Sequence, residues 1–80
     1  MKEHTEELLV AQIFGLCMEE PKTIEDMTNR IYKNLYAKNI VRVYQCCEIL
    51  MKRGVLIPKF HDRTLLFQID EKIFRRTNGE

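Results

Sequence analysis

The chain has 80 residues, of which 45% are hydrophobic and 31% are charged, and its net charge is +1. This length supports one domain with one hydrophobic core, and the composition is too apolar for a disordered protein. The longest apolar stretch, residues 8–18, contains Gln12 and Gly15 and is far short of the ~20 residues that cross a bilayer. The first seven residues contain three glutamates and one lysine, unlike the basic start of a secretory signal. We therefore expect an intracellular, cytoplasmic protein.

Charge is unevenly distributed along the chain. Residues 1–20 contain one lysine and five glutamates, a net charge of −4. Residues 29–64 contain eight basic residues against Glu48 and Asp62, a net charge of +6. A basic segment of this kind suggests an anionic partner, and a solvated surface of mixed charge is the alternative interpretation.

The cysteines indicate neither a disulfide framework nor a metal site. Cys17, Cys46 and Cys47 are odd in number and two are adjacent, which favours a reducing compartment. Together with His4 and His61 they have no spacing typical of zinc ligands. The chain also has no P-loop, no glycine-rich phosphate cradle and no Ser/His/Asp set. We expect a protein that is not an enzyme and holds no metal or cofactor.

The first predicted helix begins after Thr5, a good N-cap, and runs to about Glu19, because Pro21 follows. Its apolar residues cover more than one face, which is more than a single core requires. A second subunit is the simplest partner that would bury these additional apolar residues. The predicted dimer interface consists of Leu9, Val10, Ile13, Phe14 and Cys17.

A turn is predicted over residues 20–22, and Thr23 with Asp26 resembles a capping box that opens a second helix. This helix ends near Lys33 or Asn34, and a further turn covers residues 36–38. Four apolar residues recur at helical spacing on one face: Ile24, Met27, Ile31 and Leu35.

Asn39 is the predicted cap of a third helix over residues 40–53, which Gly54 ends. Its inner face comprises Ile40, Val43, Cys46, Cys47 and Leu50. Cys46 lies at the margin of that face, where a redox-sensitive or intersubunit thiol is an open alternative to a core residue. The outer face comprises Lys38, Val41, Gln45, Glu48 and Lys52, and Arg42 and Tyr44 flank it.

After Gly54 the apolar period changes to two, which predicts strands over residues 55–60 and 65–69 around a polar turn. Leu65, Phe67 and Ile69 share one face, and Pro58 requires an edge strand. Asp70 is a cap for a short helix over residues 71–76. The tail, residues 77–80, is expected to fray.

Residues 46–56, with apolar residues three apart, a charged stretch and then Gly54 before an aliphatic pair, resemble the end of the recognition helix in winged helix-turn-helix proteins. Asp62 and Arg63 are similar to the acid–arginine pair in the wing of MarR-like regulators, and residues 68–72 to the strand-to-helix exit of such domains. The resemblance covers residues 23–72, and small archaeal and archaeal-virus regulators are the nearest in shape. The connection between the second and third helices is longer than the usual tight turn, which leaves the docking angle of the third helix open.

This resemblance implies an α+β, mostly helical winged-helix domain spanning residues 1–80. A three-helix core is followed by a two-stranded β-hairpin wing at about residues 55–70 and a short C-terminal helix.

The resemblance also implies sequence-specific binding of double-stranded DNA by a dimeric transcriptional regulator, in a host cell if the source is a virus. Residues that would read bases in the major groove are Val41, Arg42, Tyr44 and Gln45. Residues that would contact phosphates are Lys38, Lys52, Arg53, Lys59 and Arg63. The alternative is a winged-helix module for protein–protein contact in a larger assembly. The operator, any effector and the direction of regulation stay open.

Overall fold

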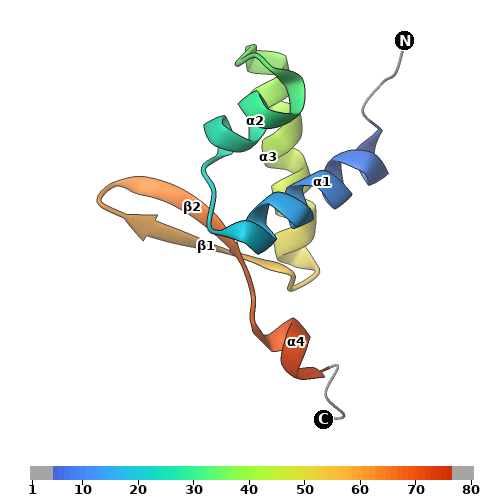
Figure 1. The fold of residues 1–80 in the computed structure, drawn as a ribbon, viewed down its shortest axis with the longest axis vertical. Helices are drawn as coiled ribbons and strands as arrows, with labels where there is room; N and C mark the ends of the chain where they lie inside the picture. The colour runs from blue at the N-terminus through green and yellow to red at the C-terminus, as the bar shows by residue number, and fades with distance from the viewer. Residues whose placement is uncertain (1–4, 77–80) are drawn as a thin grey trace.

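The computed structural model describes residues 5–76, in which three helices precede a β-hairpin and a short helix (Figure 1). The elements in chain order are α1 (Glu6–Glu19), α2 (Ile24–Tyr32), α3 (Ala37–Lys52), β1 (Leu56–His61), β2 (Thr64–Ile69) and α4 (Lys72–Arg76). The predicted α+β order is confirmed. The tail predicted to fray, residues 77–80, lies outside the described residues. Within residues 5–76 no helix combines the length and apolar character needed to span a membrane.

Hydroxyl caps begin the first two helices, as predicted. The Thr5 side chain accepts a hydrogen bond from the Leu8 N–H at 3.2 Å, and the Thr23 side chain accepts one from the Asp26 N–H at 3.0 Å. Helix α2 ends at Tyr32, slightly before the predicted end. Lys33 adopts a left-handed conformation there, with φ of 66°. This conformation stops the helix.

The segment between α1 and α2 is not the simple turn that the sequence predicts. The backbone of Lys22 pairs with that of Phe67 as an isolated antiparallel bridge beside β2. The Lys22 side chain is only 2% exposed, and its Nζ donates to the Leu16 carbonyl oxygen at 2.9 Å and to Glu19 Oε1 at 3.3 Å. Helix α1 has no basic residue in its last turn. The Lys22 ammonium therefore supplies the cation and the donors that the C-terminus of a helix favours.

The start of α3 also differs from the prediction, because Asn39 is not its cap. Tyr36 occupies the N-cap and the helix begins at Ala37, where a turn was predicted. Asn39 is 7% exposed, and its side-chain amide donates to Asn34 Oδ1 at 2.9 Å. The same oxygen accepts from the Tyr36 N–H at 3.1 Å. The connector of residues 33–36 is thus held in place by one asparagine side chain.

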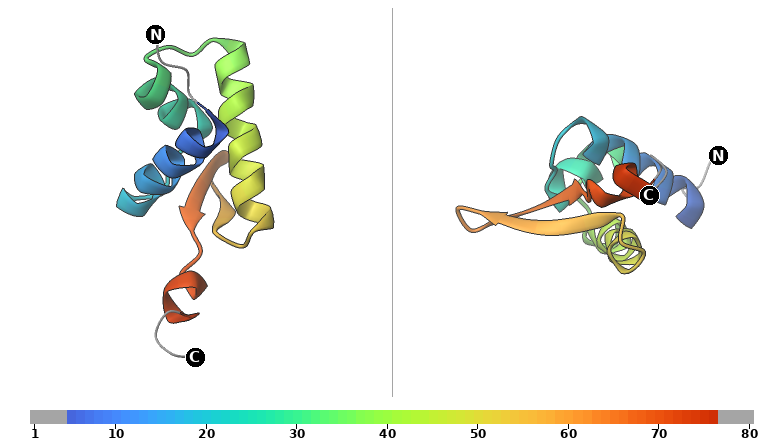
Figure 2. Two further views of the ribbon diagram at one scale, coloured as in Figure 1. Left: turned by 90° about the vertical axis from the view of Figure 1, so that its right-hand side faces the viewer. Right: turned by 90° about the horizontal axis from the view of Figure 1, so that it is seen from below.

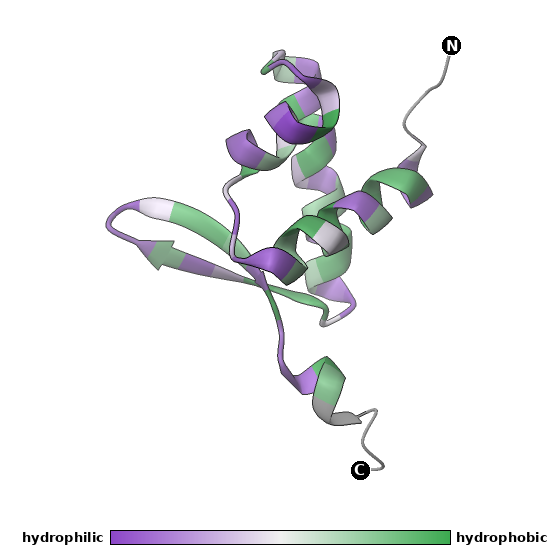
Figure 3. Ribbon diagram, in the orientation of Figure 1, coloured by the Kyte–Doolittle hydropathy of each residue, from purple (hydrophilic) through white to green (hydrophobic). Residues whose placement is uncertain are grey.

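One cluster of buried apolar residues joins α1, α2, α3 and the hairpin. The ribbon coloured by hydropathy shows hydrophobic segments on these elements (Figure 3). The predicted inner face of α3 is confirmed for Val43, Cys47 and Leu50, whereas Ile40 is half-buried. Cys46, predicted at the margin of this face, is 4% exposed and belongs to the core. The complete cluster is Leu9, Ile13, Cys17, Met27, Val43, Cys46, Cys47, Leu50, Leu56, Phe67 and Ile69.

The predicted dimer interface on α1 needs correction for three of its five residues, because they are buried. Leu9 and Ile13 are 0% exposed and Cys17 is 4% exposed, because this face of α1 covers the protomer's own core. These three side chains are therefore not available to a second subunit. Val10 and Phe14 are half-buried against the core. The apolar surplus of α1 lies instead at Leu8 and Met18, which are 44% and 50% exposed.

The hairpin is a regular antiparallel pair whose register runs from Leu56 opposite Ile69 to His61 opposite Thr64. Each strand lies within one residue of its predicted bounds. Within the described residues β1 pairs with β2 alone, so the edge position predicted for Pro58 is confirmed. The hairpin projects well beyond the three helices (Figure 2). Its base is therefore part of the core, whereas its tip stands apart from the body.

Candidate nucleic-acid interface

Helix α3 presents opposite faces to the core and to solvent. We keep the name outer face for Lys38, Val41, Gln45, Glu48 and Lys52. Four of these residues are exposed, including Val41 at 51%, and Glu48 is half-buried. The opposite side of the helix is packed against α1, α2 and β1. The outer face is therefore the only long face of α3 that a partner can reach within the described residues.

Arg42 and Tyr44 lie on opposite flanks of the outer face, because residues two positions apart are separated by about 200° around the helix axis. Burial raises the pKa of the Cys46 thiol, the nearby Glu6 carboxylate raises it further, and the Arg42 guanidinium lowers it. Arg42 and Glu6 therefore both act on the edge of α3 that is turned toward α1. Tyr44 is 39% exposed and lies on the opposite flank, the side of Ile40.

The hairpin tip, residues 59–64, carries the second group of basic residues. Lys59 and Arg63 are both exposed. Asp62 and Arg63 form the two-residue turn with φ of 52° and 69°. Positive φ at both positions is the type I′ geometry, whose twist matches that of the two strands. His61 Nε2 lies 3.6 Å from Asp62 Oδ2 in an exposed contact.

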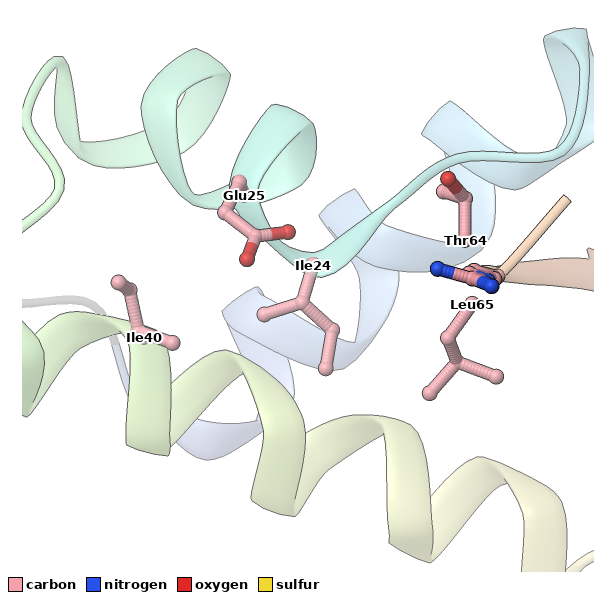
Figure 4. A pocket seen from close by; sticks show the side chains of 6 residues that line it. Ile24, Glu25, Ile40, Thr64 and Leu65 are labelled. Carbon is pink, nitrogen blue, oxygen red and sulfur yellow. The ribbon is translucent and has the colours of Figure 1, made fainter. Parts of the chain in front are cut away.

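A hollow of about 420 Å³ lies where the starts of α2 and α3 face the hairpin (Figure 4). Its apolar walls are Ile24, Ile40 and Leu65. Glu25, Thr64 and Arg63 supply its polar groups. The hollow thus joins the N-terminal half of α3 to the hairpin tip, and it brings Arg63 to the same concave surface as α3.

All nine residues predicted to contact bases or phosphates are exposed. They lie in three separate regions of the structure. Lys38, Val41, Arg42, Tyr44 and Gln45 lie in the first two-thirds of α3, and Lys52 and Arg53 lie at its far end, beside the base of the hairpin. Lys59 and Arg63 lie at the tip. A partner that touches all nine must therefore span α3 and the length of the hairpin.

Three features of this surface were not singled out in the sequence. Phe60 is 73% exposed at the hairpin tip, and Tyr36 is 63% exposed at the N-cap of α3. Glu25 places a carboxylate in the hollow beside Arg63. The alternating pattern around Phe60 indicates a strand, but it does not indicate how far that strand extends past the core.

The three thiols have no access to this surface. Burial raises the pKa of Cys17 to about 11, partly offset by Lys22. Burial, with smaller effects from Cys17 and Cys46, raises the pKa of Cys47 to about 12. Because all three thiols are buried and stay protonated near neutral pH, they are poor nucleophiles. Among residues 5–76 no three His, Cys, Asp or Glu side chains form a group that could hold a metal ion.

Comparisons with protein-family models, with curated proteins and with solved structures give no match to this chain.

Proposed function

We propose that the protein is a winged-helix protein that binds double-stranded DNA sequence-specifically and regulates transcription. One observation carries this proposal. The outer face of α3 carries exposed Lys38 and Lys52 against the half-buried Glu48, and the hairpin tip carries exposed Lys59 and Arg63 against Asp62, whereas the opposite side of α3 is buried. In this interpretation α3 is the recognition helix, and the hairpin is the wing.

The dimensions and chemistry of α3 suit the major groove, which admits one helix. Its 16 residues give a length of about 24 Å. Gln45 has the donor and acceptor needed for a bidentate contact with adenine, and Val41 can pack on a thymine methyl group. Arg42 can pair with guanine only if its side chain extends outward from the flank nearest α1. The base contacts of Val41, Tyr44 and Gln45 therefore require less rearrangement than that of Arg42.

We infer further that the protein acts as a homodimer, because two recognition helices would then meet two half-sites of DNA. The interface uses the exposed part of α1 and not its buried face. Leu8 and Met18 are the large apolar residues there. With the exposed Ala11 and Gly15 between them at helical spacing, they form one stripe along α1.

A module for protein–protein contact is the second candidate, and a different observation favours it. Leu35 and Tyr36 are 51% and 63% exposed just before α3, and Val41 is 51% exposed on its outer face. Exposed large apolar residues around a helix that should meet a polyanion are more typical of a surface that binds protein. The basic residues around it favour DNA.

A salt titration of binding to random-sequence duplex DNA tests the proposal. Five phosphate contacts per protomer predict that the logarithm of affinity falls with the logarithm of salt concentration, with a slope of about −4.5 per protomer. A fluorescently labelled duplex of about 25 base pairs and the full chain are sufficient, starting at ~50 mM salt. Absence of salt-dependent affinity for any duplex would contradict DNA binding. The protein-contact candidate would then replace it.

A further inference from the structure

Phe60 is the most exposed large apolar side chain of the described residues, at 73%. Side chains alternate between the two faces of a strand, so Phe60 shares a face with Leu56, which is buried in the core. Its cross-strand partner, Leu65, lines the hollow between the hairpin and the helices. Phe60 therefore continues the apolar face of the hairpin past the point where the helices cover it. Nothing within the described part of the protomer requires an aromatic residue there.

The surroundings of Phe60 indicate which partner would cover it. Lys59 precedes it in β1, and Arg63 is the second residue of the two-residue turn that follows β1. Both cations are exposed, and among residues 59–64 Asp62 is the only acid. A protein partner with an apolar pocket would have to desolvate these two cations, whereas DNA phosphates pair with them directly. The charge around Phe60 thus favours a nucleic acid.

The shape of the hairpin indicates where on the DNA Phe60 would lie. A two-stranded ribbon that ends in a two-residue turn is narrow, and it projects beyond the helices (Figure 2). With α3 in the major groove, such a projection reaches past the adjacent phosphates to the neighbouring minor groove. Apolar side chains that enter the minor groove often insert between base pairs, unstack them and bend the duplex.

We propose that Phe60 is such a wedge: it enters a base step of the bound duplex, so that the protein bends its DNA. Lys59 and Arg63 hold the phosphates on either side of the opened step. This inference rests on the proposed DNA-binding function. Because pyrimidine–purine steps unstack most easily, it also predicts a preference for a TA step under the hairpin tip, at a position that α3 does not contact.

Fluorescence energy transfer between dyes at the two ends of a duplex of about 30 base pairs tests the proposal, with each protein at saturating concentration. The wild type shortens the end-to-end distance, and more so when a TA step replaces an A-tract under the hairpin tip. Phe60→Ala still binds, with affinity changed by less than about tenfold, because the cost of unstacking disappears together with the contact. The end-to-end distance of its complex stays at that of free DNA.

Ile57→Ala is the matched control. Ile57 is 36% exposed on the opposite face of the same strand, so its truncation should leave the bend unchanged. Circular dichroism checks that both variants fold.

The possible failures are distinguishable. A wild type that binds with the expected salt dependence but does not shorten the duplex overturns the wedge and leaves DNA binding intact. A wild type that binds no duplex removes both. A Phe60→Ala variant that still bends DNA but sediments differently from the wild type also overturns the wedge, and it assigns Phe60 to contact between protein chains.

Discussion

Lys22 and Phe67 exchange two backbone hydrogen bonds, with N···O distances of 3.0 Å and 2.8 Å. This pair connects the segment between α1 and α2 to the outer edge of β2, so it fixes the hairpin relative to the helices. The same lysine turns its side chain back to the end of α1. Nζ lies 2.9 Å from the Leu16 carbonyl oxygen and 3.4 Å from that of Glu20. Lys22 therefore joins the end of α1, the connection between α1 and α2, and β2. These three parts together determine where the hairpin points.

Lys22→Met should destabilise the protein by about 1–3 kcal/mol, because the carbonyl groups at the end of α1 lose a charged donor in a site with little water. Urea denaturation followed by circular dichroism measures this change. Lys52→Met, at an exposed position, is the control and should change the free energy of unfolding by less than about 0.5 kcal/mol. Equal stabilities of the two variants would show that the buried ammonium contributes nothing.

Cys47 should make the stability fall at alkaline pH. Its pKa in the folded protein is about 12, against 9.0 as the ordinary value. The stability that the buried, protonated Cys47 thiol contributes is therefore fully present below pH 9. It is lost as the pH rises toward 12, because in this range the unfolded chain releases the thiol proton and the folded protein keeps it. Between about pH 10 and 11 the free energy of unfolding should fall with pH more steeply in the wild type than in Cys47→Ala, by about 1.4 kcal/mol per pH unit. Parallel curves would refute this.

Variants of α3 and of the hairpin tip should weaken DNA binding in different ways. Gln45→Ala or Arg42→Ala should cost about 1–3 kcal/mol on the preferred site and relax the preference at one base position. Lys59→Ala or Arg63→Ala should weaken binding to all duplexes alike and reduce the salt slope by about one. Competition binding against a panel of duplexes measures both effects. If all four variants lower affinity equally on every sequence, α3 does not read bases.

Glu25→Gln should strengthen DNA binding, because this carboxylate shares the hollow with Arg63 and repels any phosphate that passes there. We expect a gain of about two- to fivefold at low salt and a smaller gain at higher salt, since mobile ions screen exposed charges. Glu7→Gln removes the same charge from α1, away from the hollow, and should leave the affinity unchanged. A gain of equal size in both variants would indicate a general effect of net charge.

If the proposed dimer forms, the protein should sediment at about twice the 9.6 kDa mass of the chain at micromolar concentration. Replacing Leu8 and Met18 together by glutamate should yield monomers, because two charges would be buried in the interface. Leu35→Glu is the control, as Leu35 is 51% exposed but lies between α2 and α3. A wild type that sediments as a monomer would show that the exposed stripe of α1 has another role.

The sequence by itself determined the elements, because their signals are local. Thr5 and Thr23 cap the helices that follow them, Gly54 takes φ of 76° after α3, and the change of period after it marks the hairpin. Which face of α3 points toward the core also follows from spacing alone, since side chains on one face of a helix recur every three or four residues. The exposure of Val41, Gln45 and Lys52 on the outer face follows from the same helical spacing.

Only the tertiary structure decided how these elements meet. The bridge of Lys22 depends on β2, which lies more than forty residues later in the chain. Asparagine is a common N-cap residue, but Asn39 lies inside α3, where its side chain is hydrogen-bonded to that of Asn34, five residues earlier. Periodicity could not tell which apolar stripe of α1 faces its own core. Leu9, predicted at the dimer interface, is buried in the core of the protomer, whereas Leu8 beside it is exposed. How far Phe60 extends past the core depends likewise on packing between distant segments, which no local pattern encodes.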